Sequence, residues 1–168
     1  MFDYVLASLI ALILSFFSGQ FSGEENTILQ PTVAEVVSVV DGDTIKVQIG
    51  GREETVRYIG IDTPEPYRDG EPACFSREAT KRNTELVEGN EVRLVSDHED
   101  EDKYGRLLRY VYVGDVFVNQ TLIEEGYAKK LSIYPNTEHA AEFARIQSEA
   151  KEEKKGLWGA CEASKGVQ

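Results

Sequence analysis

The sequence predicts an α+β domain, mainly β, in which five strands close into an OB-fold barrel with three helices. Two observations predict this class. Five short strand-type runs follow one another with a helical segment after the third, and further helical segments end the chain. The 168 residues, 41% of them hydrophobic, are also enough for one compact domain with its own core, behind an N-terminal hydrophobic segment.

The hydrophobic segment at the N-terminus is the run YVLASLIALILSFF, residues 4–17, which carries no charge. Its length is closer to the core of a signal peptide than to the roughly 20 residues of a spanning helix. No Lys or Arg precedes the run, and no A-x-A spacing follows it. Residues 1–23 are therefore interpreted either as a signal peptide or as an uncleaved membrane anchor in which residues 4–21 contact the membrane. Both interpretations place the domain outside the cytoplasm, either secreted or anchored.

The strands are predicted from alternating runs rich in β-branched residues and bounded by turn residues. These runs occupy residues 33–40, 43–50, 54–61, 91–97 and 107–118. Gly50-Gly51 is typical of a hairpin turn, and the last run is expected to fold back across Gly114-Asp115. A polar linker is expected at 24–32, the domain at 33–163 and a tail at 164–168.

Three segments have the pattern and the stop signals of helices. Residues 75–88 follow a Pro- and Gly-rich loop at 64–72, and residues 118–128 end near Gly126. Residues 137–156 are amphipathic and stop at Gly156. Together with the strands, these helices complete the predicted domain.

The formal net charge is −12. This balance argues against a protein that coats nucleic acid, because neutralising phosphates requires Lys and Arg. It fits an enzyme that concentrates a few cations in one site, and it also fits an extracellular cation-binding or adhesive domain. The acidic run DHEDED, residues 97–102, is interpreted as a solvated loop because it lacks the central Gly of a calcium-binding EF-hand loop.

Chemistry-bearing side chains gather in three segments, VVDGDTIKV (39–47), RYIGIDTPE (57–65) and DKYGRLLRY (102–110). Two aspartates, Asp43 and Asp62, and the carbonyl of Thr63 are hard oxygen ligands that suit Ca²⁺ or Mg²⁺. A remaining carboxylate, Glu65, can act as a general base, and two arginines, Arg57 and Arg106, can grip a phosphate. A phosphodiesterase needs this set of groups.

In this order and spacing, the three segments resemble the signature segments of the staphylococcal nuclease (thermonuclease) family, over residues 33–158. The resemblance implies a five-stranded barrel with three helices. It also implies a Ca²⁺-dependent nuclease that cuts DNA and RNA to products ending in 3′-phosphate. We expect such a protein to act as a monomer.

The resemblance also assigns roles to single residues. Asp43 and Asp62 would be the side-chain calcium ligands, with the carbonyl of Thr63. Glu65 would be the general base, and Arg57 and Arg106 would hold the scissile phosphate. Three further residues are expected to contact the nucleotide: Lys103, Tyr104 and Tyr134.

Two departures from the family pattern bear on substrate affinity and remove no catalytic group. The loop after Glu65 is short and has Arg68 as its only cation, where the best-known member has a longer, lysine-rich loop. Ser132 stands where that member has an aromatic residue near the nucleotide.

The chain has two cysteines, Cys74 and Cys161. An even number in an exported chain is compatible with a disulfide, and two free buried thiols are the alternative. Exported members of the family that this chain resembles often carry cysteines at these two places. The resemblance therefore implies a disulfide between Cys74 and Cys161.

The alternative function is that of a catalytically inactive OB-fold module that binds nucleic acid or protein. Such a module has no need to keep the two aspartates, the glutamate and both arginines together. A shared site also makes a geometric demand, because Arg57 and Asp62 would face opposite sides of a regular strand. We therefore predict that the strand bends before Asp62, at Gly60.

Overall fold

The computed structural model describes residues 31–66 and 71–163 of the chain. The predicted N-terminal hydrophobic segment, most of the predicted linker and the C-terminal tail lie outside these residues. Within the described ranges, no helix combines the length and the apolar character needed to cross a membrane.

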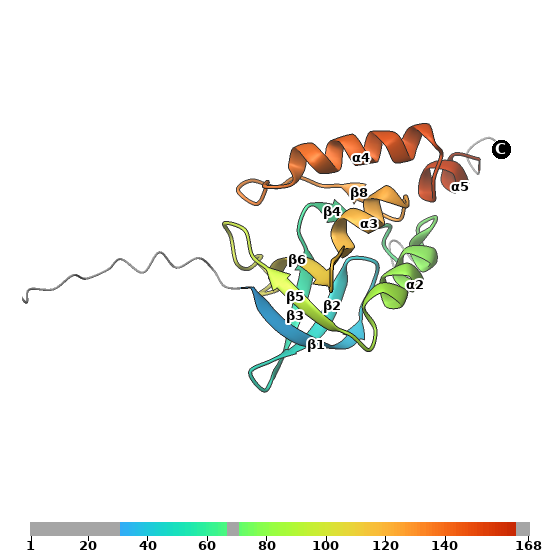
Figure 1. Ribbon diagram of the computed structural model, residues 1–168. Coiled ribbons are helices and arrows are strands. Elements are labelled where there is room, and N and C mark those ends of the chain that lie inside the picture. The colour runs from blue at the N-terminus through green and yellow to red at the C-terminus, as the bar shows by residue number, and fades with distance from the viewer. Residues whose placement is uncertain (1–30, 67–70, 164–168) are drawn as a thin grey trace, which may run out of the picture.

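A closed five-stranded barrel forms the body of the domain, as predicted (Figure 1). Its strands are β1 (Thr32–Val39), β2 (Thr44–Ile49), β3 (Arg52–Tyr58), β5 (Glu91–Val95) and β6 (Leu107–Val113). Neighbouring strands pair antiparallel in the order β3-β2-β1-β5-β6. The barrel closes where β3 and β6 pair in parallel, from Val56 opposite Leu107 to Tyr58 opposite Arg109.

The barrel interior is filled by alternate residues of these strands, because successive side chains of a strand point to opposite faces. Ile45 and Val47 of β2 are fully buried, whereas Gln48 is exposed. Val56 and Tyr58 of β3 are buried in the same core. The period-two pattern of the sequence therefore set which face of each strand points inward.

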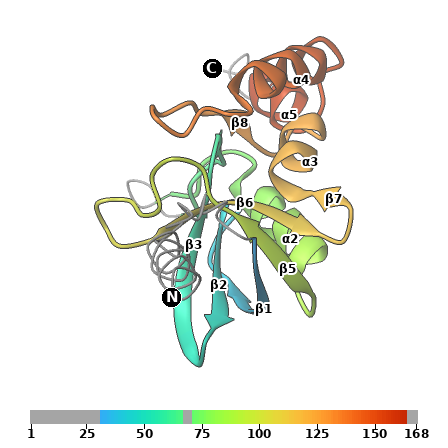
Figure 2. The ribbon, with the colours of Figure 1, turned by 60° about the vertical axis from the view of Figure 1, so that its left-hand side comes forward.

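The described helices are α2 (Ser76–Val87), α3 (Val118–Glu124), α4 (Ala140–Glu152) and α5 (Leu157–Ala163). Figures 1 and 2 both show α3, α4 and α5 at one end of the barrel, with α2 beside it. The three predicted helices are confirmed with shorter bounds, and α5 is an addition. It begins directly after Gly156, whose positive φ of 50° ends the preceding segment, and Leu157 at its start is buried.

Helix α2 holds the turn that precedes β2. The Tyr58 hydroxyl donates to the Asn83 side-chain oxygen at 2.9 Å, and the Asn83 amide nitrogen donates to the Asp41 carbonyl at 2.9 Å. Asn83 is fully buried, so these hydrogen bonds are shielded from water. They fix the position of the Asp41-Gly42-Asp43 turn relative to β3.

The strand that carries Arg57 breaks at Gly60, as predicted. β3 ends at Tyr58, the chain turns through Ile59 and Gly60, and a separate short strand, β4 (Ile61–Asp62), follows. β4 pairs with β8 (Lys129–Lys130) outside the barrel. The single run predicted over 54–61 is therefore wrong at its end, because Gly60 adopts a φ of +83° that no regular strand contains.

We expect Gly60→Ala to lower the free energy of unfolding by about 2–4 kcal/mol, from a left-handed backbone cost plus overpacking. A Cβ at this position would lie 2.6 Å from one ring carbon of Phe143, a fully buried residue of α4. Denaturant unfolding followed by circular dichroism measures the change. Gly89→Ala is the matched control, since its φ is +73° and nothing lies within 4 Å of the added carbon. Equal losses in the two variants would contradict the role of the Phe143 contact.

The hairpin predicted over residues 107–118 is present in the structure except for its last residue, Val118. β6 turns across Gly114-Asp115 into β7 (Val116–Phe117), which confirms the hairpin. Val118 then begins α3 and is fully buried, so it belongs to the helix and not to the strand.

Cys74 and Cys161 form a disulfide across a sequence separation of 87 residues. The bond joins the segment before α2 to α5 and confirms the pairing that the family resemblance implied. The alternative of two free thiols is wrong for this structure.

Candidate active site

Three segments that are distant in sequence bring an arginine and two aspartates together. Arg57 lies near the end of β3, Asp43 lies in the turn before β2, and Asp62 ends β4. The Arg57 Nη1 atom lies 2.6 Å from Asp43 Oδ1, and its Nη2 atom lies 3.3 Å from Asp62 Oδ1. The bend at Gly60 makes the second contact possible.

Asp43 is a buried carboxylate whose two oxygens are both engaged. Oδ2 accepts hydrogen bonds from the Thr63 main-chain N–H at 2.7 Å and from the Thr63 hydroxyl at 3.0 Å. Oδ1 contacts Arg57 and accepts from the Thr44 hydroxyl at 3.2 Å. Burial raises the pKa of Asp43 to about 7, and Arg57 and the Thr63 donors offset this only in part. Additional positive charge near Asp43 would therefore stabilise its carboxylate as an anion.

Gly42 explains why the turn reads Asp-Gly-Asp. A Cβ at this position would lie 2.7 Å from the Thr63 hydroxyl oxygen and 2.8 Å from the Thr63 Cβ. Only glycine lets the turn approach Thr63 closely enough for Asp43 to accept its hydrogen bonds.

Asp41, the first residue of this turn, is a further site residue, to which the sequence analysis assigned no role. Its Oδ1 atom accepts a hydrogen bond from the Asp43 N–H at 3.0 Å. Its charge also raises the pKa values of Asp43 and Glu65. The Asp-Gly-Asp spacing was the signal that could have identified it.

Glu65 lies just beyond β4 and is exposed. Its carboxylate has no hydrogen-bond or ion-pair partner in the described part of the chain, whereas its main-chain carbonyl accepts from the Ala73 N–H at 3.0 Å. Partial burial, followed by the charge of Asp41, raises the pKa of Glu65, and Arg57 acts in the opposite direction. A carboxylate with a raised pKa and free oxygens can accept a proton from a water molecule.

Arg106 is held by Asp102 at the start of β6. Its Nε and Nη2 atoms lie 2.7 and 2.6 Å from Asp102 Oδ2. The other carboxylate oxygen accepts from the main-chain N–H groups of Tyr104 and Arg106, at 2.9 and 3.1 Å. Partial burial raises the pKa of Asp102, but these hydrogen bonds lower it by a larger amount. The pKa of Asp102 therefore lies below its ordinary value. Asp102 therefore fixes both the tight turn and the guanidinium group, a contact that sequence reasoning missed.

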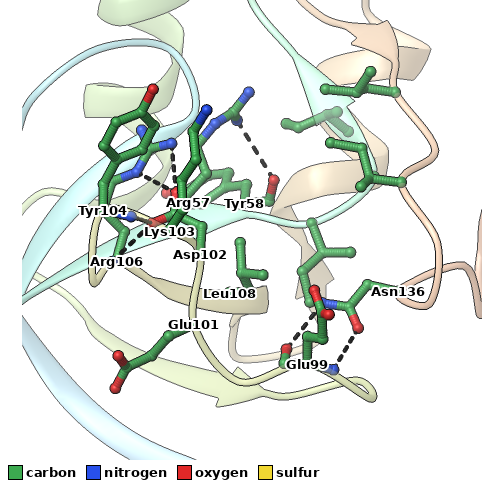
Figure 3. Close-up of a pocket in the computed structure, with 15 residues that line it drawn as sticks. Arg57, Tyr58, Glu99, Glu101, Asp102, Lys103, Tyr104, Arg106, Leu108 and Asn136 are labelled. Carbon is green, nitrogen blue, oxygen red and sulfur yellow. Dashed lines mark hydrogen bonds and ion pairs between the residues drawn. The ribbon is translucent and has the colours of Figure 1, made fainter.

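A pocket of about 710 Å³ lies between this turn, the end of β3 and the segment after β8 (Figure 3). Its polar and charged lining comes from Arg57, Glu99, Glu101, Asp102, Lys103, Arg106 and Asn136, and its aromatic and apolar lining includes Tyr58, Ile59, Ile61, Tyr104, Leu108, Leu131 and Ile133. Arg57 both lines the pocket and contacts the two aspartates, so the pocket adjoins the carboxylate cluster.

The structure places the residues expected to contact a nucleotide in two groups. Lys103 and Tyr104 line the pocket, and Tyr104 is 72% exposed. Tyr134 is 88% exposed and is not among the lining residues, although its neighbour Ile133 is. The roles of all three stay predictions. Ser132 is exposed next to Ile133.

The carboxylates can take part in holding a hard cation, but they do not form a complete ligand set. The described residues contain no group of three or more His, Cys, Asp or Glu side chains that could hold a metal ion. Two aspartates with a main-chain oxygen fit a cation such as Ca²⁺ only if water fills the remaining positions. Asp62, with a side chain that is 48% exposed, leaves room for such waters.

Comparison with known proteins identifies relatives of the whole domain. A family model described as "Staphylococcal nuclease homologue" matches residues 55–160. Over 124 residues, 71% of this chain, the sequence is 46% identical to the "SPbeta prophage-derived endonuclease YokF" and 44% identical to the "Endonuclease YncB", both of Bacillus subtilis. The alignments span only 41% and 58% of these two relatives. The "Thermonuclease" of Staphylococcus hyicus is 32% identical over 92% of this chain and 93% of its own length.

Proposed function

The chain belongs to the staphylococcal nuclease family, and from this premise we propose that it is a calcium-dependent nuclease that hydrolyses phosphodiester bonds of DNA and RNA. The observation that carries the proposal is the position of Arg57, which contacts Asp43 and Asp62 while lining the adjacent pocket. A phosphate bound to Arg57 would thus lie between a carboxylate cluster and a cavity that can receive a nucleoside.

In this proposal, Arg57 and Arg106 hold the scissile phosphate and stabilise the charge that develops on its oxygens. Glu65 takes a proton from a water molecule, whose oxygen attacks the phosphorus. The bond from phosphorus to O5′ breaks, and O5′ gains a proton, which leaves one product with a 3′-phosphate. Asp102 keeps Arg106 oriented toward the pocket through its two contacts with the guanidinium group.

Calcium would be held by Asp43 and Asp62 together with the carbonyl of Thr63. The ion would supply positive charge next to the phosphate and so favour attack by water. The raised pKa of Asp43 supports a cation at this place, because a buried carboxylate is stabilised as an anion by an added positive charge. The family relationship supports calcium as the metal.

We expect the purified protein to degrade single-stranded DNA at millimolar Ca²⁺ and to stop when a chelator is added in excess, because the phosphate then loses the charge of the metal. Release of acid-soluble nucleotides measures the rate, and restored Ca²⁺ should restore it. A chelator already saturated with Ca²⁺ is the control. An unchanged rate in excess chelator would contradict the metal assignment, and no cleavage at millimolar Ca²⁺ would contradict the proposed activity.

We also propose that the domain acts as a monomer outside the cytoplasm, secreted or anchored by its N-terminal segment. The Cys74–Cys161 disulfide supports an oxidising compartment, since such bonds rarely persist in the cytosol. A mass measurement on the native protein would distinguish a cleaved from a retained N-terminal segment.

A further inference from the structure

The pocket has two ends of different chemistry. In Figure 3, Arg57, Lys103, Tyr104 and Arg106 lie together at one end, where Asp102 pairs with Arg106, and Glu99 lies with Asn136 at the other. Leu108 lies between the two ends in Figure 3, and further apolar side chains line the pocket. A ligand that spans the pocket therefore meets three cations and one paired carboxylate at the first end, then apolar side chains, and then the Glu99 carboxylate at the other end.

Asn136 fixes the main chain of Glu99 at its end of the pocket. The Asn136 side-chain oxygen accepts from the Glu99 N–H at 2.7 Å, and its amide nitrogen donates to the Glu99 carbonyl at 2.9 Å. Asn136 is only 6% exposed, whereas Glu99 itself is exposed, so both bonds are partly buried. The Glu99 carboxylate has no hydrogen-bond or ion-pair partner among the residues that the structure describes. It remains available to a ligand.

A nucleotide fits this arrangement in one direction. Its phosphate belongs at the arginine end, and its base can lie against the apolar lining of the pocket, which includes Leu131 and Ile133, 38% and 62% exposed. A carboxylate at the far end repels a phosphate but accepts hydrogen bonds, so only the edge of the base can face Glu99 productively. Adenine, cytosine and guanine present a protruding amino group there, whereas thymine and uracil present a single ring N–H flanked by two carbonyl oxygens, which repel a carboxylate.

We propose that Glu99 makes this pocket selective for nucleotides whose base carries an exocyclic amino group. The proposal rests on the proposed nuclease function and deepens it by naming the preferred substrate. Glu99 acts on specificity and not on the bond that breaks. Its contribution to kcat/KM is a preference of about tenfold, within the range that a good contact to a base supplies.

The test compares kcat/KM for single-stranded oligo(dC), oligo(dA) and oligo(dT) of equal length. The protein should cleave oligo(dC) and oligo(dA) about tenfold more efficiently than oligo(dT), and Glu99→Gln should reduce this ratio to about one, because a neutral amide no longer favours a donor. Glu138→Gln is the matched control. It removes the same charge from an exposed acid two residues after Asn136, and Glu138 is not among the residues that line the pocket. A ratio that Glu99→Gln leaves unchanged, or a preference for oligo(dT) in the parent protein, would overturn the inference.

Binding of dCMP and dTMP by equilibrium titration separates this inference from the nuclease proposal, because it requires no hydrolysis. Tighter binding of dCMP that depends on Glu99, without any cleavage of DNA, would support the pocket and remove the nuclease assignment. Cleavage of DNA with equal binding of dCMP and dTMP would support the nuclease and overturn the role of Glu99.

Discussion

Replacing Glu65 by Gln is expected to lower kcat for hydrolysis of single-stranded DNA by about 10²- to 10⁴-fold, the contribution usual for a general base. A Gln amide has nearly the shape of the carboxylate but cannot take a proton from water. The Glu65 carboxylate is exposed and has no partner in the described residues, so its replacement removes no contact that stabilises the fold. KM and the free energy of unfolding should stay close to those of the parent protein.

Initial rates at saturating Ca²⁺ measure this effect, and Glu71→Gln serves as its control. Glu71 is an exposed acid of the same loop, so its replacement changes the net charge equally and should leave kcat unchanged. Full activity of Glu65→Gln would show that another group deprotonates the water.

The pH profile gives an independent measurement of the same role. A general base must be ionised, so the rate should fall as the pH falls through the pKa of Glu65. Partial burial and the charge of Asp41 raise this pKa, so the fall should begin above the ordinary range of a carboxyl group. An acid limb that Glu65→Gln leaves unchanged would belong to a different residue.

The barrel could be predicted because its information is local. Alternation along β2 and β5 shows which side chains point inward, and Gly50-Gly51 marks its hairpin without knowledge of the rest of the chain. Helix α5 could not be predicted in this way, because it has only seven residues and no strong period. It forms where Leu157 packs against the domain and the disulfide holds Cys161.

The candidate site could also be predicted only where its residues lie close together in the sequence. The positions of Arg57 and Asp62 could be anticipated, including the bend at Gly60, since the two residues lie within one short motif. The contact between Asn136 and Glu99 joins residues 37 positions apart, and nothing in either segment alone indicates it. The same holds for the exposed position of Tyr134, which depends on how its segment packs beside the pocket and not on its residue type.

The disulfide is expected to have the second large effect, this time on stability. Replacing both Cys74 and Cys161 by Ser should lower the free energy of unfolding by about 4–5 kcal/mol, because the bond restricts an unfolded chain over a separation of 87 residues. Denaturant unfolding in the presence and absence of a reducing agent measures this loss. The reducing agent should destabilise the parent protein by the same amount and should leave the double Ser variant unchanged.

The same variant tests whether the disulfide also positions the catalytic loop. Cys74 follows Ala73, whose N–H donates to the Glu65 carbonyl, so the disulfide anchors the far end of the loop that carries Glu65, the proposed general base. The near end is held separately, because Thr63 donates two hydrogen bonds to the buried Asp43. We therefore expect the double Ser variant to keep kcat within about threefold of the parent value under conditions where it stays folded, far less than the change that a general base contributes. A loss of kcat as large as that of Glu65→Gln, in a variant shown to be folded, would mean that Asp43 and Thr63 alone cannot hold Glu65 in place.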